Sequence, residues 1–198
     1  MARPRTHDET LQRQLLETAA QILAAGGPPA LNLRTLARAA GTSTSAVYSL
    51  FGGKSALLRA IYAEGFARLS RRLAAVEPSD DPAEDLVQLG LAYRASALQS
   101  PRLYPVMFGQ SPAGLEPGEP GRGAGREALG LLAAAVTRGV RAGVFPAGSE
   151  RRLTLAAWAL AHGLVSLELN GLLPGGGSAE ADYERILRDT VGGWQDRG

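Results

Sequence analysis

The stretch NLRTLARAAGTSTSAVYSLFGGKSALL, residues 32–58, decides the fold of this chain. Apolar residues recur at helical spacing on both sides of Gly41, which predicts two short helices. Gly41 suits the left-handed backbone conformation that ends a helix, and Ser43 has a side-chain oxygen that can accept a bond from a free N–H at the start of the next one. Residues 32–58 therefore predict a helix-turn-helix.

The second of these helices has a polar face as well as an apolar one. If Val47, Leu50 and Phe51 point into a core, the polar residues of the same helix must face outward. These outward residues are Thr44, Ser45, Tyr48 and Ser49. Small donors with one aromatic hydroxyl fit the major groove of DNA. An ordinary solvated helix has the same pattern, so the face alone leaves both interpretations open.

Composition excludes several classes of protein. At 198 residues and 45% hydrophobic content, the chain can bury a sizeable core. It has no cysteine, which excludes disulfides, thiolate zinc sites and cysteine nucleophiles. The N-terminus lacks a continuous apolar segment, and no stretch approaches the roughly 18 apolar residues of a membrane span. We therefore expect a soluble, cytoplasmic protein.

Charge is distributed unevenly although the net charge is only +2. Residues 1–75 hold ten basic and four acidic side chains, and the rest of the chain holds eleven basic and fifteen acidic ones. A basic N-terminal part joined to an acidic remainder is typical of a nucleic-acid module that carries a second domain. Arg3 and Arg5 form an arm that either is disordered or contacts a phosphate backbone or a minor groove.

The remaining sequence predicts further helices and no strand. We expect a helix over about 7–25, ended by the Gly26–Pro29 run, and a long helix from Lys54 to about 76. Asp81, Pro82 and Glu84 predict another helix start. Residues 109–125 are rich in glycine and proline without periodicity, which predicts a mobile loop. Later helices are expected up to Gly143, within 151–173 and over about 179–195.

Residues 151–173 are apolar on every side of the predicted helix, so every side must be covered. This pattern indicates that one side packs inside the subunit and another against a second copy. The last helix has its own apolar stripe and completes the expected contact. The residues predicted for this dimer interface are Leu164, Val165, Leu167, Glu168, Ile186, Leu187, Val191 and Trp194.

The segment LRTLARAAGTSTSAVYSLFGGKSALL resembles the helix-turn-helix pattern LxxLAxxAGVSxxxLYxxFxxKxxLL of the tetracycline-repressor (TetR) family, nearly position for position. Thr42 departs from the usual valine. Trp158, His162 and Gly163 resemble the tryptophan, histidine and glycine signature of one C-terminal subgroup. The resemblance implies an all-α homodimer of about nine helices per chain. Residues 1–53 would bind operator DNA, and residues 54–198 would bind a ligand and dimerise.

Site residues follow from the same resemblance. By position, Arg34, Thr44, Ser45, Tyr48 and Ser49 would face DNA, and Lys54 would reach a phosphate. Independently of the family, Lys54 is the one lysine among 21 basic residues and opens a helix, where free N–H groups favour an anion. His162 is either a core histidine or a pocket residue with Trp158. The predicted pocket walls are Phe66, Tyr93, Tyr104, Met107, Phe108, Trp158 and His162.

No catalytic or metal-binding motif appears. The two histidines, His7 and His162, are far apart in sequence, and no acid and histidine cluster has metal-ligand spacing. GGKS at 52–55 ends like a P-loop, but the glycine required earlier falls at Tyr48. We therefore predict a non-enzymatic transcriptional regulator without a cofactor, a repressor released from a palindromic operator by a small hydrophobic effector. The alternative is a helical scaffold whose basic N-terminus attracts acidic partners non-specifically.

Overall fold

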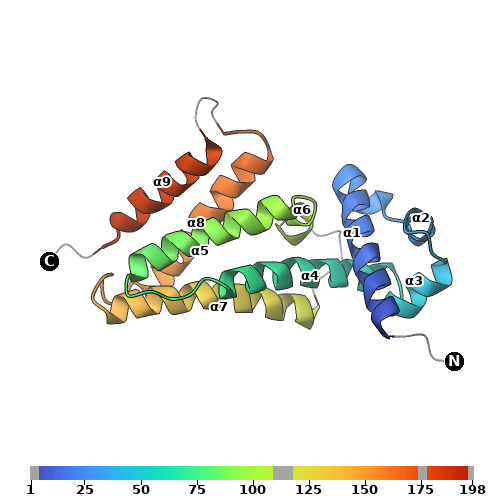
Figure 1. Cartoon of the computed structure of the whole chain (residues 1–198), viewed down its shortest axis with the longest axis horizontal. Coiled ribbons are helices and arrows are strands. Elements are labelled where there is room, and N and C mark those ends of the chain that lie inside the picture. The colour runs from blue at the N-terminus through green and yellow to red at the C-terminus, as the bar shows by residue number, and fades with distance from the viewer. Residues whose placement is uncertain (1–4, 109–117, 174–177, 196–198) are drawn as a thin grey trace. The chain divides into compact units, whose positions relative to one another are not determined.

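The computed structural model describes residues 5–108, 118–173 and 178–195, and within these ranges the chain forms nine helices and no strand (Figure 1). The all-α prediction is therefore confirmed. The helices are α1 (Arg5–Ala30), α2 (Leu33–Ala39), α3 (Thr44–Phe51), α4 (Lys54–Ala74), α5 (Pro82–Gln99), α6 (Tyr104–Phe108), α7 (Glu119–Arg141), α8 (Glu150–Leu169) and α9 (Ala179–Gly192).

The chain divides into two compact units. Unit 1 comprises Met1–Phe66 and Ser100–Gly123, and unit 2 comprises Ala67–Gln99 and Ala124–Gly198. Two divisions fall inside helices, one in α4 and one in α7. The units are defined by packing, whereas the predicted boundary at residues 53 and 54 concerns function and stays a prediction.

Unit 1 is built around one apolar core that joins α1, α2, α3, α6 and the first part of α4. Side chains with no exposed surface meet there from four of these helices: Leu15, Leu36, Val47, Leu57 and Ile61. Leu103, just before α6, belongs to the same core and is 5% exposed. The helix-turn-helix, which ends at Phe51, is thus held in part by a residue more than fifty positions further along the chain.

Unit 2 has α5 at its centre, packed against α8 and α9. Tyr183 of α9 is 2% exposed, and its hydroxyl donates to the backbone oxygen of Gly90 at 3.1 Å. Because Gly90 has no side chain, Leu187 can lie close to α5: a Cβ at Gly90 would be 2.6 Å from Leu187 Cδ1. Asp81 starts α5 as predicted, since its Oδ1 accepts bonds from the N–H groups of Ala83 and Glu84.

The helical backbone of α1 is interrupted within the predicted Gly26–Pro29 run, because Gly27 is non-helical (φ 67°, ψ −173°), but α1 continues beyond this kink to Ala30. Helical backbone resumes at the prolines, which fit the first turn of a helix because they need donate no bond there. The loop predicted for 109–125 is helical from Glu119, and its first part, 109–117, lies outside the described residues.

Candidate functional site

Side-chain caps begin both α2 and α3, and the cap at Ser43 is as predicted. Asn32 Oδ1 accepts from the N–H of Arg34 at 2.8 Å, and Ser43 Oγ accepts from the N–H of Ala46 at 3.1 Å. Gly41 has φ 65°, in the left-handed region. On the side of α1, Gln14 Nε2 donates to the backbone oxygen of Ala40 at 3.3 Å, a contact that the sequence did not reveal. The caps fix where each helix begins and ends.

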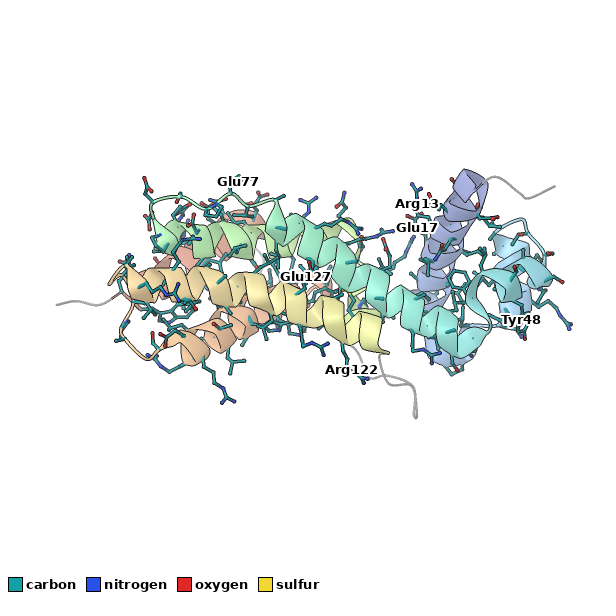
Figure 2. All side chains as sticks on the ribbon, turned by 90° about the horizontal axis from the view of Figure 1, so that it is seen from below. Arg13, Glu17, Tyr48, Glu77, Arg122 and Glu127 are labelled. Atoms are coloured by element: carbon teal, nitrogen blue, oxygen red, sulfur yellow. The ribbon has the colours of Figure 1, made fainter. Side chains whose placement is uncertain are left out.

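The outward face of α3 is as polar as predicted. Val47 is completely buried and Phe51 is 8% exposed, whereas Tyr48 is 54% exposed and projects away from the helix (Figure 2). Ser45 and Ser49 are exposed with it, and Thr44 is half-buried. Since residues three and four positions apart share one helix face, Ser45, Tyr48 and Ser49 form a single surface.

Basic side chains accompany this surface. Arg34 in the first turn of α2 and Lys54 at the first position of α4 are both exposed. Gly52 ends α3 in the left-handed conformation (φ 76°), which allows α4 to begin two residues later with Lys54. Arg5 is the first residue of α1, and Arg3 lies outside the described residues. An exposed helix with neighbouring cations can contact base edges and phosphates in a major groove.

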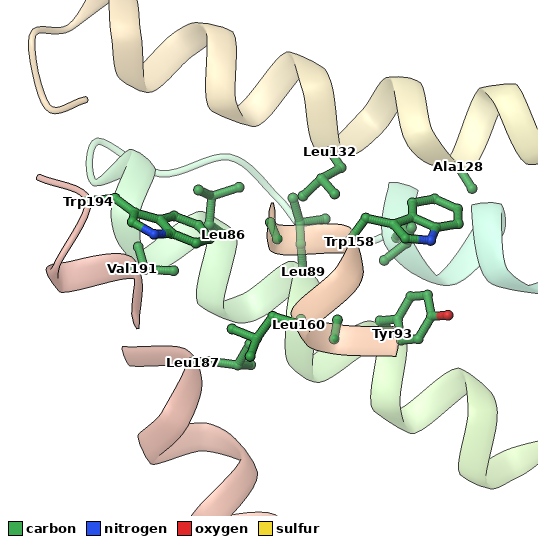
Figure 3. A pocket seen from close by; sticks show the side chains of 14 residues that line it. Leu86, Leu89, Tyr93, Ala128, Leu132, Trp158, Leu160, Leu187, Val191 and Trp194 are labelled. Atoms are coloured by element: carbon green, nitrogen blue, oxygen red, sulfur yellow. The ribbon is translucent and has the colours of Figure 1, made fainter. Parts of the chain in front are cut away.

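Unit 2 encloses an apolar cavity between α4, α5, α7, α8 and α9 (Figure 3). The cavity has a volume of about 30 Å³. The largest contributions come from α5, with Leu86, Leu89, Gly90 and Tyr93, and from α8, with Trp158 and its neighbours. Leu73 near the end of α4 completes the wall on one side.

The structure divides the predicted pocket residues between the two units. Tyr93 and Trp158 line the cavity of unit 2, where their rings meet edge to face with centroids 6.2 Å apart. His162 does not line it, but its Nδ1 lies 3.1 Å from the hydroxyl of Tyr93. Burial lowers the pKa of His162 below its usual 6.5, so the neutral imidazole is favoured.

The other predicted pocket residues lie in unit 1. The ring of Phe66 lies 5.3 Å from that of Phe108, which in turn lies 4.8 Å from Tyr104. Met107 packs against Gly65, where a Cβ would be 2.6 Å from Met107 Cγ and Sδ. These four side chains form a cluster in which α6 packs against α4, and none of them lines the cavity.

Residues predicted for a dimer interface have three different surroundings. Leu187, Val191 and Trp194 line the cavity, and Val165 is completely buried. Glu168 binds Arg94 within the chain. The exposed members of the predicted set are Leu167 (42%) and Ile186 (38%), and Leu164 is half-buried. A second copy could reach the exposed members without disturbing unit 2.

An ion pair connects α5 and α8 beside the cavity wall. Arg94 donates from Nε and one terminal nitrogen to the two carboxylate oxygens of Glu168, at 2.8 and 2.6 Å. The two side chains are only 13% and 14% exposed. The bonds to Glu168 raise the pKa of Arg94 further above its already high value.

Two family models match the chain. Residues 15–61 match the bacterial regulatory proteins of the tetR family, and residues 86–190 match the tetracyclin repressor-like C-terminal domain. The chain belongs to the TetR family. It is therefore a DNA-binding transcriptional regulator, and the TetR match of residues 15–61 covers α2, α3 and the caps described above. The C-terminal subgroup signature at Trp158, His162 and Gly163 stays a prediction.

Solved structures share this TetR fold. A protein of unknown function from Rhodococcus sp. RHA1 is 31% identical, with a TM-score of 0.79 over 94% of this chain and 96% of its own. The TetR family transcriptional regulator PfmR from Thermus thermophilus is 24% identical, with a TM-score of 0.72 over 92% and 99%. The regulator FadR from Bacillus subtilis, solved with stearoyl-CoA, is 15% identical, with a TM-score of 0.76 over 90% and 96%. No curated protein sequence matches the chain.

Two kinds of feature are absent from the part of this TetR protein that the structure describes. Among the described residues, no three or more histidine, cysteine or carboxylate side chains gather in a way that could hold a metal ion. None of the described helices has the length and apolarity to cross a membrane. The TetR cavity walls that the sequence analysis missed are mainly leucine and alanine, residues that have no chemical signature apart from their position in space.

Proposed function

We propose that this regulator is a repressor that binds a palindromic operator as a homodimer and leaves it when a small hydrophobic effector enters the cavity of unit 2. The observation that carries the proposal is α4, a single helix with Lys54 in its first turn and the cavity residue Leu73 in its last. A ligand that displaces the end of α4 acts on the same helix that presents Lys54.

The proposed mechanism is a population shift between two dimers. In one, the two α3 helices have the separation of successive major grooves, about 34–36 Å. In the other, stabilised by the effector, that separation differs and operator affinity falls. FadR from Bacillus subtilis, which shares the fold, was solved with stearoyl-CoA, and this supports a ligand-binding role for the present chain. The exposed Leu155 and Leu167 of α8 support a dimer through that helix.

Two substitutions separate the roles of the DNA-facing residues. Lys54→Ala should weaken binding to all DNA similarly and reduce the salt dependence by about one counterion, because it removes one phosphate contact. Tyr48→Ala should also change the sequence preference, because Tyr48 lies on the outward face of α3. Arg151→Ala, an exposed cation on α8 in unit 2, is the matched control and should leave both properties unchanged.

Binding is measured by fluorescence anisotropy with DNA from upstream of the protein's own gene, with unrelated DNA as competitor at physiological salt. If every variant loses affinity equally for the upstream DNA and for the unrelated DNA, the result favours the alternative, a helical scaffold with a non-specific basic surface. If the separation of the α3 helices is the same with DNA and with effector bound, the proposed population shift is wrong. Native mass spectrometry of the purified protein would identify a co-purified effector.

A further inference from the structure

The described residues that line the cavity of unit 2 provide no counter-ion for a charged ligand. Among the described residues that line it, none has a charged side chain, and the side-chain polar groups are the Tyr93 hydroxyl and the indole N–H groups of Trp158 and Trp194. A charge that leaves water without a partner loses several kcal/mol of solvation. The walls therefore favour an uncharged molecule.

Charged side chains on α5 do not alter this conclusion, because they are already paired. Arg94, next to Tyr93, donates two hydrogen bonds from its guanidinium group to the carboxylate of Glu168. Asp85, next to Leu86, is 3% exposed, accepts bonds from Ser79 and forms an ion pair with Arg138. A ligand carboxylate or ammonium would have to displace one of these internal partners to gain a counter-ion.

Tyr93 carries the one hydroxyl group among the described side chains that line the cavity. It is 5% exposed, its ring is fixed edge to face against Trp158, and its hydroxyl lies 3.1 Å from Nδ1 of His162. A phenolic hydroxyl has one donor and two acceptor positions, so a bond to His162 and a bond to a ligand are compatible. A neutral imidazole can be an acceptor or a donor at Nδ1, so Tyr93 paired with His162 can bind either a hydrogen-bond donor or an acceptor of the ligand.

The size of the cavity limits the ligand further. The cavity volume of about 30 Å³ is enough for roughly two water molecules, since one water needs about 10–15 Å³. A compact ring exceeds this space by less than a long acyl chain does, so it needs the smaller displacement of the cavity walls. Figure 3 shows Trp158 beside Tyr93 and Trp194 beside Leu86 and Val191.

We propose that the cavity binds an uncharged, compact, apolar molecule with one hydrogen-bonding group held by the hydroxyl of Tyr93, and that it rejects carboxylates and ammonium ions. The inference rests on the proposed function in that the cavity is taken as the effector site. It adds the chemical class of the effector and assigns its recognition to Tyr93, with His162 as a positioning residue.

Three probes with one carbon skeleton test the inference: cyclohexylmethanol, cyclohexanecarboxylate and the cyclohexylmethylammonium ion. Both tryptophans of the chain line the cavity, so intrinsic fluorescence of the full-length protein reports occupancy without a label. We expect the alcohol to bind and each ion to bind at least about a hundredfold more weakly, because each must be neutralised or desolvated. Comparable affinity for an ion, or no signal with any probe, would overturn the inference.

Tyr93→Phe keeps both fluorophores and removes only the hydroxyl. It should weaken binding of the alcohol about three- to tenfold, the usual effect of one neutral hydrogen bond, whereas Tyr62→Phe, at a ring that packs against Phe66 in unit 1, should not. Equal affinity in the Tyr93→Phe variant would remove the role of the hydroxyl. Operator binding is measured separately: if the alcohol binds but operator affinity does not change, the proposed release mechanism fails while the ligand class stands.

Discussion

Replacing Glu168 with alanine tests the role of the ion pair between α5 and α8. The substitution removes two charge-assisted bonds, at 2.8 and 2.6 Å, from Arg94, whose side chain is only 13% exposed in the intact pair. Breaking a fully buried pair costs about 3–5 kcal/mol. Glu180 lies 3.8 Å from Arg94 and is 72% exposed, so it offers partial compensation. We therefore expect a loss of about 2–3 kcal/mol in the free energy of unfolding.

Urea unfolding at fixed protein concentration measures this loss as a lower midpoint with an unchanged slope. Glu184→Ala is the matched control, because Glu184 binds Arg188 on the surface of α9, with side chains 39% and 44% exposed. An exposed pair contributes at most about 1 kcal/mol. If Glu168→Ala costs no more than this control, the ion pair is not what holds α8 on α5. Replacing Arg94 and Glu168 together by methionine and leucine should recover most of the loss.

Two further predictions concern the core of unit 2. Gly90→Ala should lower the free energy of unfolding by about 1–3 kcal/mol in urea, because the new Cβ meets Leu187 Cδ1 at 2.6 Å. Gly130→Ala in α7, with no atom within 4 Å of the new Cβ, should instead be stabilising, and equal effects would contradict the packing argument. Because burial lowers the pKa of His162, the unfolded chain takes up a proton near pH 6.5 that the folded chain does not, so stability should fall as the pH decreases through about 6.5. His162→Gln should reduce the difference between urea midpoints at about pH 7.5 and 5.5, and an unchanged difference would exclude His162 as its source.

Local signals predicted unit 1 well. The caps of Asn32 and Ser43, the left-handed Gly41 and the inward Val47 depend only on residues a few positions away, so the sequence specifies them directly. The same reasoning failed at residues 119–125, because glycine lowers helix propensity by only about 1 kcal/mol per residue and the longer helix overrides it.

Pairing between distant helices could not be predicted in the same way. The apolar stripe of α9 identified Leu187, Val191 and Trp194 as residues that must be covered, but periodicity does not say by what. The sequence analysis assigned them to a second copy, whereas the structure places them on the wall of a cavity within unit 2. Likewise Glu168 finds its partner 74 positions earlier, at Arg94, a separation that no local pattern encodes.

Each unit consists of two segments, and the segments of the two units alternate along the sequence. This order affects which recombination events between such regulators transfer a complete unit. A single crossover after Phe66 would transfer α1, α2 and α3 but leave behind Ser100–Gly123, which belongs to the same unit. The recipient would then need its own residue in place of Leu103 to close the apolar core under the helix-turn-helix. A chimaera that inherits both segments, or a recipient whose residue there matches Leu103 in volume, keeps that core filled. Gene fusions joined at one point should therefore be viable mainly between close homologues.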